Sequence, residues 1–425
     1  MVKKERVSLV GHDDVYSARV IGADRRRSTL ASVAVLAAAL LSRPTRAATP
    51  TCSSLPTPVY VQAADTSEPA LKAIGQQLRA NTAKPITIIY SLSGSCTNVD
   101  AMFNGTKLTT NPNYVPSQTD MPGWDPTQPS PQCTIDPAGV SLDLVSSAVF
   151  VNACTTQANP SGIETFPGGV EPVVFVIPEA DVTDLAITAE EAYFVFGFGA
   201  SDQVMPWNDP SFMFIRTTTK GTLITLGANI HVPPAKWQGV QLASSSSVVT
   251  SVATSTSPQK TIGILGGEVF DQNRNTLNAL AFRTFSQNHA YYPDSTSGTK
   301  DKRNVRDGHY VLWSRYSYLA PTDTTGTIAN PNAAYVLDLL TDQPVSPTPS
   351  FDPLATIVSV GQVPDCAMTV TRSSEGGDLS LYAPAAPCGC FFESLVGTAP
   401  TSCVACSSAT PCSSGTCRHG FCEAR

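Results

Sequence analysis

Short apolar runs alternate with polar loops along most of this chain, and the first two runs set the pattern. Residues 58–64 (PVYVQAA) and 85–90 (PITIIY) are nearly continuous apolar stretches, typical of strands buried on both faces of a sheet. The segment after the first run carries Pro69 at an early helical position and then repeats leucine and isoleucine at helical spacing. The pattern predicts a strand, a helix and a second strand.

The same order continues downstream and indicates the α/β class. The second strand leads through SLSGSC (91–96) into a predicted helix at NVDAMF. Thr188 and Glu191 have the spacing of a capping box that opens a helix, and Gly197 is expected to close it. The spacing of NTLNALAF (275–282) predicts another helix. Further strands are expected at 140–151, 168–178, 212–216 and 261–267.

Two segments have a less regular pattern. Residues 105–140 are rich in Pro, Asn and Thr and predict an excursion loop, tied down by Cys133. Residues 244–257 are rich in Ser and Thr, which is typical of a flexible linker. Valines at 248, 249 and 252 have helical spacing, however, and favour a helix equally.

Three loops share one design, in which a strand runs into a polar turn and then into a helix. They are 63–69 (AADTSEP), 91–96 (SLSGSC) and 216–222 (RTTTKGT). Such loops lie at the carboxyl ends of parallel strands, where helix N-termini present unpaired N–H groups and a partial positive charge. Hydroxyls and an arginine would add hydrogen bonds to an oxyanion held there. Any single loop of this composition is also what an ordinary capped turn requires.

Composition limits the fold and the partner class. The 425 residues are 42% hydrophobic, enough for a sizeable core, and the 34 prolines and 28 glycines argue against a long helical bundle. Residues 1–48 hold nine Lys and Arg but only four Asp and Glu, so without them the net charge falls from −7 to −12. A chain this acidic is not expected to bind nucleic acid.

The first 48 residues have the features of a secretory signal peptide. Three arginines at 25–27 precede an apolar run at 29–41, and Ala47 and Ala48 follow as small residues. The apolar run is too short to span a bilayer comfortably, which disfavours a membrane anchor. Residues 26–30 resemble a twin-arginine signal except at Thr29, so both export routes stay open. We expect a periplasmic or extracellular protein.

Twelve cysteines fit an oxidising compartment. From Cys366 onward the chain is cysteine-rich and poor in large apolar residues, which predicts a small disulfide-rich tail at 391–425. Zinc binding by the last cysteines and His419 is the less favoured alternative in an exported chain. The disulfide candidates are Cys52, Cys96, Cys133, Cys154, Cys366, Cys388, Cys390, Cys403, Cys406, Cys412, Cys417 and Cys422.

No catalytic signature is present in the sequence. The histidines show no metal-ligand spacing, and no G-x-S-x-G motif marks a nucleophile. His309 in DGHY fits a packed or hinge residue better than a catalytic base, because histidine catalysis needs a partnered site. We therefore expect neither an enzyme, nor a metal site, nor a cofactor.

Between about Val59 and Cys390 the chain resembles the periplasmic phosphate-binding proteins of ABC importers, in the type II solute-binding fold. The segments that carry this resemblance are TSEPALKAIGQQL, IIYSLSGSC, EEAYFVFGFG, PWNDPSFMFIR, TIGILGGEVFDQNRNTLNALAF, YYPDS and DKRNVRDGHY, in this order along the chain. A branch of that family with an appended Cys-rich tail is the most similar.

The resemblance implies nine ligand-binding positions, all in or beside the three loops. They are Thr66, Ser67, Gly94, Ser95, Ser147, Arg216, Lys220, Gly221 and Thr222.

Two departures from the family pattern concern the ligand. The family has Arg, three residues and then Ser-Gly-Thr, whereas Lys220 stands here in place of the serine. The family aspartate that accepts a hydrogen bond from protonated phosphate is replaced by Ala148. The preference for phosphate over sulfate is therefore open, and so is a larger or more anionic ligand.

The resemblance further implies two lobes around a hinged cleft. Residues 53–165 with 310–390 would form lobe one, and residues 166–309 lobe two. The expected function is capture of a small oxyanion, phosphate first, by a monomer that serves an ABC permease. The alternative is a secreted or surface interaction protein that keeps the fold without transport and contacts a partner through its tail.

Overall fold

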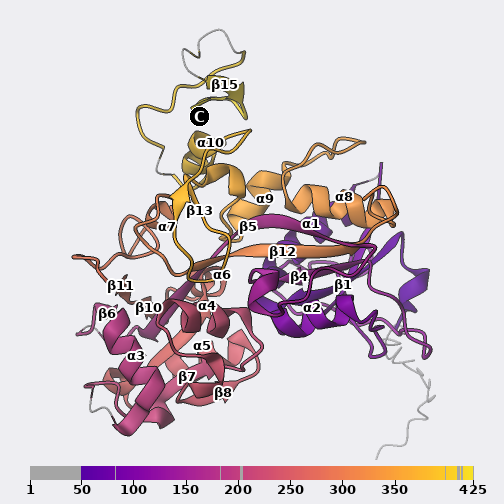
Figure 1. Ribbon diagram of the computed structural model, residues 1–425. Coiled ribbons are helices and arrows are strands. Elements are labelled where there is room, and N and C mark those ends of the chain that lie inside the picture. The colour runs from indigo at the N-terminus through magenta and orange to yellow at the C-terminus, as the bar shows by residue number, and fades with distance from the viewer. Residues whose placement is uncertain are drawn as a thin grey trace, which may run out of the picture. The chain divides into compact units, whose positions relative to one another are not determined.

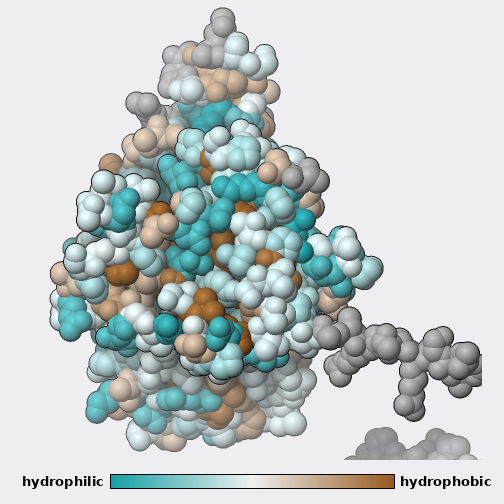
Figure 2. All heavy atoms as spheres, turned by 90° about the vertical axis from the view of Figure 1, so that its right-hand side faces the viewer, coloured by the Kyte–Doolittle hydropathy of each residue, from teal (hydrophilic) through white to brown (hydrophobic). Residues whose placement is uncertain are grey.

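The computed structural model describes residues 49–424, except 82, 182, 202–203, 398, 409–411 and 413–414. The predicted signal peptide, residues 1–48, lies outside the described residues. Among the described residues, no helix is long and apolar enough to cross a membrane. On the face shown in Figure 2, hydrophobic residues lie in small groups between hydrophilic ones.

A mixed sheet of ten strands organises the described chain (Figure 1). Along the sheet the order is β3-β2-β1-β4-β12-β5-β9-β7-β8, and β10 also pairs with β5. The strands are β1 (Pro58–Ala64), β2 (Thr87–Ser93), β3 (Asn113–Tyr114), β4 (Leu144–Ser147), β5 (Ile163–Pro178), β7 (Met213–Arg216), β8 (Val240–Leu242), β9 (Ile262–Gly266), β10 (Leu277–Ala279) and β12 (Trp313–Pro321).

The long strand β5 joins the two parts of this sheet. Its first half pairs antiparallel with β12, and its residues 173–176 pair antiparallel with β9. On one side of this junction, β2, β1 and β4 run parallel; on the other, β9, β7 and β8 run parallel. The predicted lobes would meet here, and their boundaries at 165, 309 and 390 remain predictions.

Helices cover both faces of the part of the sheet that contains β1, β2 and β4. The strands of this part are therefore apolar on both sides. Helices α1, α8 and α9 pack together on one face and α2 lies on the other (Figure 1). The helices are α1 (Glu68–Ala80), α2 (Ser95–Phe103), α3 (Ala189–Phe198), α4 (Gly221–Asn229), α5 (Ser245–Ala253), α6 (Gly267–Gln272), α7 (Arg303–Arg306), α8 (Pro331–Leu340), α9 (Pro353–Ser359) and α10 (Gly389–Leu395).

Local sequence signals predicted most of the elements in this region correctly, but they misplaced the end of α3. The capping box of Thr188 and Glu191 opens α3 as predicted. Gly197 does not close that helix; Gly199, at a φ of 56°, ends it because glycine tolerates positive φ. Residues 244–257 contain α5, with Val248 and Val252 buried.

The helix predicted at 275–282 is wrong. These residues form β10, which pairs with β5, and then β11 (Ala281–Arg283), which pairs with β6 (Ala186–Thr188). A short apolar run is ambiguous between helix and strand. Here the strand form is favoured, because the free edge of β5 has backbone N–H and C=O groups that a neighbouring strand can pair with and a helix cannot.

Six disulfides join all twelve cysteines, which fits an oxidising compartment. Cys52–Cys133 ties the excursion loop to the short turn that precedes β1, as predicted for Cys133. The tail contains α10 and the hairpin of β15 (Gly415–Arg418) with β16 (Phe421–Ala424), and β13 (Val370–Thr371) pairs with β14 (Ser380–Leu381) just before it. The predicted α/β class with a disulfide-rich C-terminal region is confirmed.

The cysteines that zinc would need are engaged in these bonds. The sulfurs of Cys406, Cys412 and Cys422 lie within 4.8 Å of one another. Each of the three is oxidised, however, with Cys406 bonded to Cys417 and Cys412 bonded to Cys422. Because zinc is held by thiolates, this grouping follows from the disulfides and does not form a metal site.

A glycine inside α1 tests how tightly the first part of the sheet is packed. A methyl group on Gly75 would lie 2.8 Å from Cγ2 and 3.0 Å from Cβ of Val115, a stiff and fully buried side chain. We expect Gly75→Ala to lower the free energy of unfolding by about 1–3 kcal/mol, measured by chemical denaturation, despite alanine's higher helix propensity.

Gly197→Ala is the matched control, because it is also helical and its nearest side-chain atom, Val232 Cγ2, lies 3.4 Å away. That variant should be neutral or more stable by up to ~1 kcal/mol. Equal stability of the Gly75→Ala variant and the unmodified protein would show that Val115 yields to the added methyl.

Candidate functional site

The second and third predicted loops contact each other. Gly94 allows this approach, because an added Cβ would lie 2.4 Å from Thr219 Oγ1. The amide of Cys96 donates to the carbonyl of Thr219 at 3.4 Å, and a Cβ on Gly221 would lie 2.8 Å from Ser95 Oγ. The N-termini of α2 and α4 are thereby brought together, and each contributes a partial positive charge.

Arg216 ends β7 at the centre of this junction. It is fully buried, and its Nη2 donates to Asp65 Oδ2 and, at 3.1 Å, to the carbonyl of Ala243. Its Nε and Nη1 have no hydrogen-bond partner among the described residues. Burial lowers the pKa of the Arg216 guanidinium, and the nearby Asp65 and Glu171 oppose that shift. A buried guanidinium with two unused donors is costly in free energy.

Lys220 precedes α4 and reaches the same carboxylate. Its Nζ lies 3.5 Å from Asp65 Oδ1 and donates to the carbonyl of Ser93 at 3.1 Å. Burial lowers the pKa of the Lys220 amine; the charge of Arg216 adds to this effect, while Asp65 opposes it. Lys220 therefore adds a second cation beside Arg216.

Asp65 is the site residue that sequence reasoning missed. It begins the 3-10 turn Asp65–Ser67 in the first loop, and Ser245 Oγ at the start of α5 donates to its Oδ2 at 3.2 Å. A signal was present in the sequence, since the first loop carries a carboxylate and the third loop two cations. Nothing in the sequence pattern, however, states that these two loops face each other.

The predicted hydroxyl ligands make hydrogen bonds within the protein. Thr66 Oγ1 donates to Glu171 Oε2 at 2.9 Å, and Ser67 Oγ lies 2.8 Å from Ser146 Oγ. Ser95 Oγ accepts from the amide of Ala148 at 3.1 Å.

Ser147 and Thr222 are also buried. Ser147 Oγ donates to the carbonyl of Val149 at 3.0 Å, and Thr222 lies in the first turn of α4. The structure thus places all nine predicted residues around one junction. Among them, Arg216 and Lys220 pair with the carboxylate of Asp65.

Two buried glutamates lie directly behind Thr66. Glu171 on β5 and Glu268 on α6 are 1% and 0% exposed. The hydroxyl of Tyr316 lies 2.9 Å from Glu268 Oε1 and 3.1 Å from the carbonyl of Thr66. The remaining oxygens, Glu171 Oε1 and Glu268 Oε2, have no hydrogen-bond partner in the described part of the chain. Both lie close to Gly266, because a Cβ added to that glycine would be 2.5 Å from the first and 3.2 Å from the second.

The surroundings of these two glutamates favour their neutral forms. Burial raises the pKa of Glu171 well above its usual range, and the charge of Glu268 raises it further. Burial also raises the pKa of Glu268, to about 8. Two carboxylates buried side by side cannot both be charged at low cost, so the junction between β5 and α6 favours protonation of the pair.

A segment before the tail braces α4 from the other side. Glu375 is half-buried; its Oε1 accepts from the amide of Phe150 at 3.0 Å and from the Ser314 hydroxyl. Asn152 Nδ2 donates to the carbonyl of Ser373 at 3.2 Å. A Cβ on the neighbouring Gly376 would lie 3.0 Å from the carbonyl of Ala228 in α4. The segment therefore links the loop after β4 to α4.

A cavity of about 530 Å³ opens beside Asp65. Asp65, Glu68 and Lys72 line it from the first loop and α1, and Ser244 to Ser246 line it from the start of α5. Gln272 and Asn273 at the end of α6, Leu92 from the second loop, and Pro126 and Thr127 also line it. The cavity gives a small solute a route to the carboxylate that covers Arg216.

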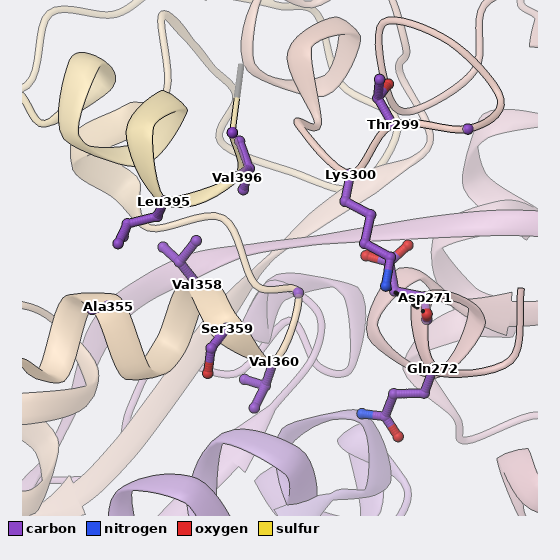
Figure 3. A pocket seen from close by; sticks show the side chains of 13 residues that line it. Asp271, Gln272, Thr299, Lys300, Ala355, Val358, Ser359, Val360, Leu395 and Val396 are labelled. Atoms are coloured by element: carbon purple, nitrogen blue, oxygen red, sulfur yellow. Dashed lines mark hydrogen bonds between the residues drawn. The ribbon is translucent and has the colours of Figure 1, made fainter. Parts of the chain in front are cut away.

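A larger cavity of about 660 Å³ lies away from the three loops, between α9, the end of α10 and the loop at 297–300 (Figure 3). Val358 and Leu395 face each other across it from the two helices. Its Lys300 Nζ donates to the carbonyl of Asp271 at 3.1 Å, and the carboxylate of Asp271 pairs with Arg274 and Lys302. None of the three predicted loops lines this larger cavity, whereas the first and second loops line the Asp65 cavity, which favours the latter as the candidate site.

Comparisons with known proteins concern the fold. No family model and no curated protein matches this chain. Among solved structures, it is similar to an ABC-type phosphate transport receptor from Vibrio cholerae, at 13% identity and a TM-score of 0.45, over 72% of this chain and 99% of that one.

A protein from Clostridium perfringens, assigned as a phosphate ABC transporter substrate-binding protein and solved with bound phosphate, has 8% identity and a TM-score of 0.49. The match covers 72% of this chain and 99% of that one. PstS from Borrelia burgdorferi has 12% identity and a TM-score of 0.38, over 72% and 98%. Similarity at this level gives no information about the ligand of this chain.

The glutamate pair predicts a pH dependence of stability. Because the pKa of Glu268 is about 8 in the folded chain, against about 4.3 when unfolded, the folded state binds more protons between these values. Stability should therefore fall as pH rises from about 4.3 to about 8, by up to ~1.4 kcal/mol per pH unit for one group. Glu268→Gln should remove this contribution, measured as the difference between variant and unmodified protein in urea denaturation across that range.

The exposed Glu190, which pairs with Arg283 at 3.4 Å, supplies the control. Glu190→Gln should leave the pH slope unchanged. If Glu268→Gln gives the same slope as the unmodified protein, then Glu268 is ionised in the folded state and the proposed acid pair is wrong.

Proposed function

We propose that this protein is an exported solute-binding protein that captures a small oxyanion, phosphate first, at Arg216 and Lys220. The observation that carries this proposal is the buried guanidinium of Arg216, whose Nε and Nη1 have no hydrogen-bond partner among the residues described. An oxyanion bound there could accept from both nitrogens at once, a geometry for which arginine is well suited.

The surroundings support an anion more than any other ligand class. Lys220 adds a second cation, and the N-termini of α2 and α4 meet next to it. The acids behind this position, Glu171 and Glu268, have raised pKa values because of burial, so they add less negative charge than two ionised carboxylates would. The site can thus attract an anion although the whole chain is acidic.

Import by an ABC permease and action as a monomer belong to the same proposal, which requires no cofactor. The six disulfides fit an exported protein. Ala148 stands where the family has an aspartate, and it is buried against the position of Gly221. A preference for phosphate over sulfate would therefore have to come from other groups.

Calorimetric titration of the mature chain with phosphate and with sulfate tests the site. We expect Arg216→Lys to weaken phosphate binding at least tenfold, because lysine keeps the charge but loses the planar fork. Lys220→Met should weaken it as well, by removing the second cation. Arg283→Lys, at the exposed ion pair with Glu190, is the control and should bind phosphate as the unmodified protein does.

Unchanged phosphate affinity in the Arg216→Lys variant, with native circular dichroism, would refute the site assignment. If neither phosphate nor sulfate gives binding heat with the unmodified protein or with any variant, including the variants of Asp65 described below, oxyanion capture is refuted. The chain would then be better described as an exported interaction protein that keeps this fold without transport.

A further inference from the structure

Asp65 already makes the contacts that an oxyanion would make. Its Oδ2 accepts from Arg216 Nη2 and, at 3.2 Å, from Ser245 Oγ, and its Oδ1 lies 3.5 Å from Lys220 Nζ. The Asp65 carboxylate thus interacts with two cations and one hydroxyl group. Building on the proposed function, we infer that Asp65 is an internal competitor of the ligand and thereby determines which anions the site accepts.

The order of burial places Asp65 between solvent and Arg216. The side chain of Asp65 is 16% exposed, that of Lys220 11%, and that of Arg216 only 1%. Asp65 also lines the 530 Å³ cavity, whereas Arg216 does not. A solute that enters through this cavity therefore meets the carboxylate before it meets the guanidinium, and the cavity offers space into which the carboxylate can turn.

Arg216 retains bonding capacity that Asp65 does not use. The carboxylate engages Nη2, while Nε and Nη1 are buried without a partner in the described chain. An incoming oxyanion with several equivalent oxygens could use these two donors as well as the position that Asp65 leaves. Exchange of Asp65 for such an anion would then gain hydrogen bonds at Arg216.

A free anion must compete with the Asp65 carboxylate for Arg216 and Lys220, and this competition favours anions of higher charge. Because Asp65 belongs to the same chain, its effective concentration at Arg216 is on the order of millimolar or higher. A free monoanion offers the two cations no more charge than Asp65 does. It gains only the hydrogen bonds to the unused Arg216 donors, and these must offset the effective concentration of the tethered carboxylate. A dianion interacts with Arg216 and Lys220 through twice the charge and can displace the carboxylate. The site should therefore favour dianions, namely sulfate and hydrogen phosphate, over monoanions such as acetate and nitrate.

Variants of Asp65 test this inference directly. Asp65→Asn keeps the shape of the side chain and removes its charge, and Asp65→Ala also vacates its space. By calorimetry, both should bind phosphate at least tenfold more tightly than the unmodified protein, and both should gain binding of nitrate. Acetate should raise the melting temperature of the Asp65→Ala variant, because it can occupy the vacated position, and should leave that of the unmodified protein unchanged.

Asp120→Asn is the matched control. Asp120 pairs with Arg79 of α1 at 2.7 Å, so the variant removes the same charge from another Asp–Arg pair, outside the three loops. Its anion binding should equal that of the unmodified protein. Circular dichroism of each variant verifies folding, and Asp65→Asn keeps the test decisive if Asp65→Ala does not fold.

The outcomes separate this inference from the proposed function. Tighter binding in the Asp65 variants supports it, including the case in which the unmodified protein is silent. Equal phosphate affinity with and without Asp65 would overturn the inference alone, and so would loss of binding in both variants, because Asp65 would then belong to the ligand cage. Silence of the unmodified protein and of both variants would overturn the inference and the proposed function together.

Discussion

The ion pair between Arg216 and Asp65 is the interaction on which the centre of this protein depends. A guanidinium cannot be fully buried without a counter-charge, and Asp65 supplies it from the loop that precedes α1. The pair fixes the end of β7 against the end of β1, although the two strands are not neighbours in the sheet. The close approach of Gly94 to Thr219 and of Gly221 to Ser95 is consistent with this constraint.

Burial determines which of the carboxyl groups near this ion pair favour the neutral form. Asp65 meets both cations, whereas Glu171 and Glu268, directly behind it, have their pKa values raised because they are enclosed by β5, α6 and Tyr316. Asp65 therefore neutralises cations, whereas the surroundings of the other two carboxyl groups favour their neutral forms. The same group of residues sets the charge of the candidate site and joins the two parts of the sheet.

The disulfides and the segment around Glu375 brace this centre from outside. Cys96–Cys154 links the start of α2 to the segment that follows β4, and the segment around Glu375 links that same region to α4. A chain rich in proline and glycine, with many short elements, gains order from such links. They hold the loops that carry the candidate ligand residues in one place.

The sequence alone determined the features that arise from near neighbours. Apolar runs located β1, β2, β5 and β9, the capping box located α3, and the strand-loop-helix order identified the three loops and Arg216. It failed at residues 275–282, where the edge of β5 decided for strands, and at Asp65, whose partners lie 151 and 155 residues away. Only the tertiary structure brings Asp65 together with Arg216 and Lys220. Which charged groups pair depends on how strands far apart in the sequence pack, and local spacing carries no information about that packing.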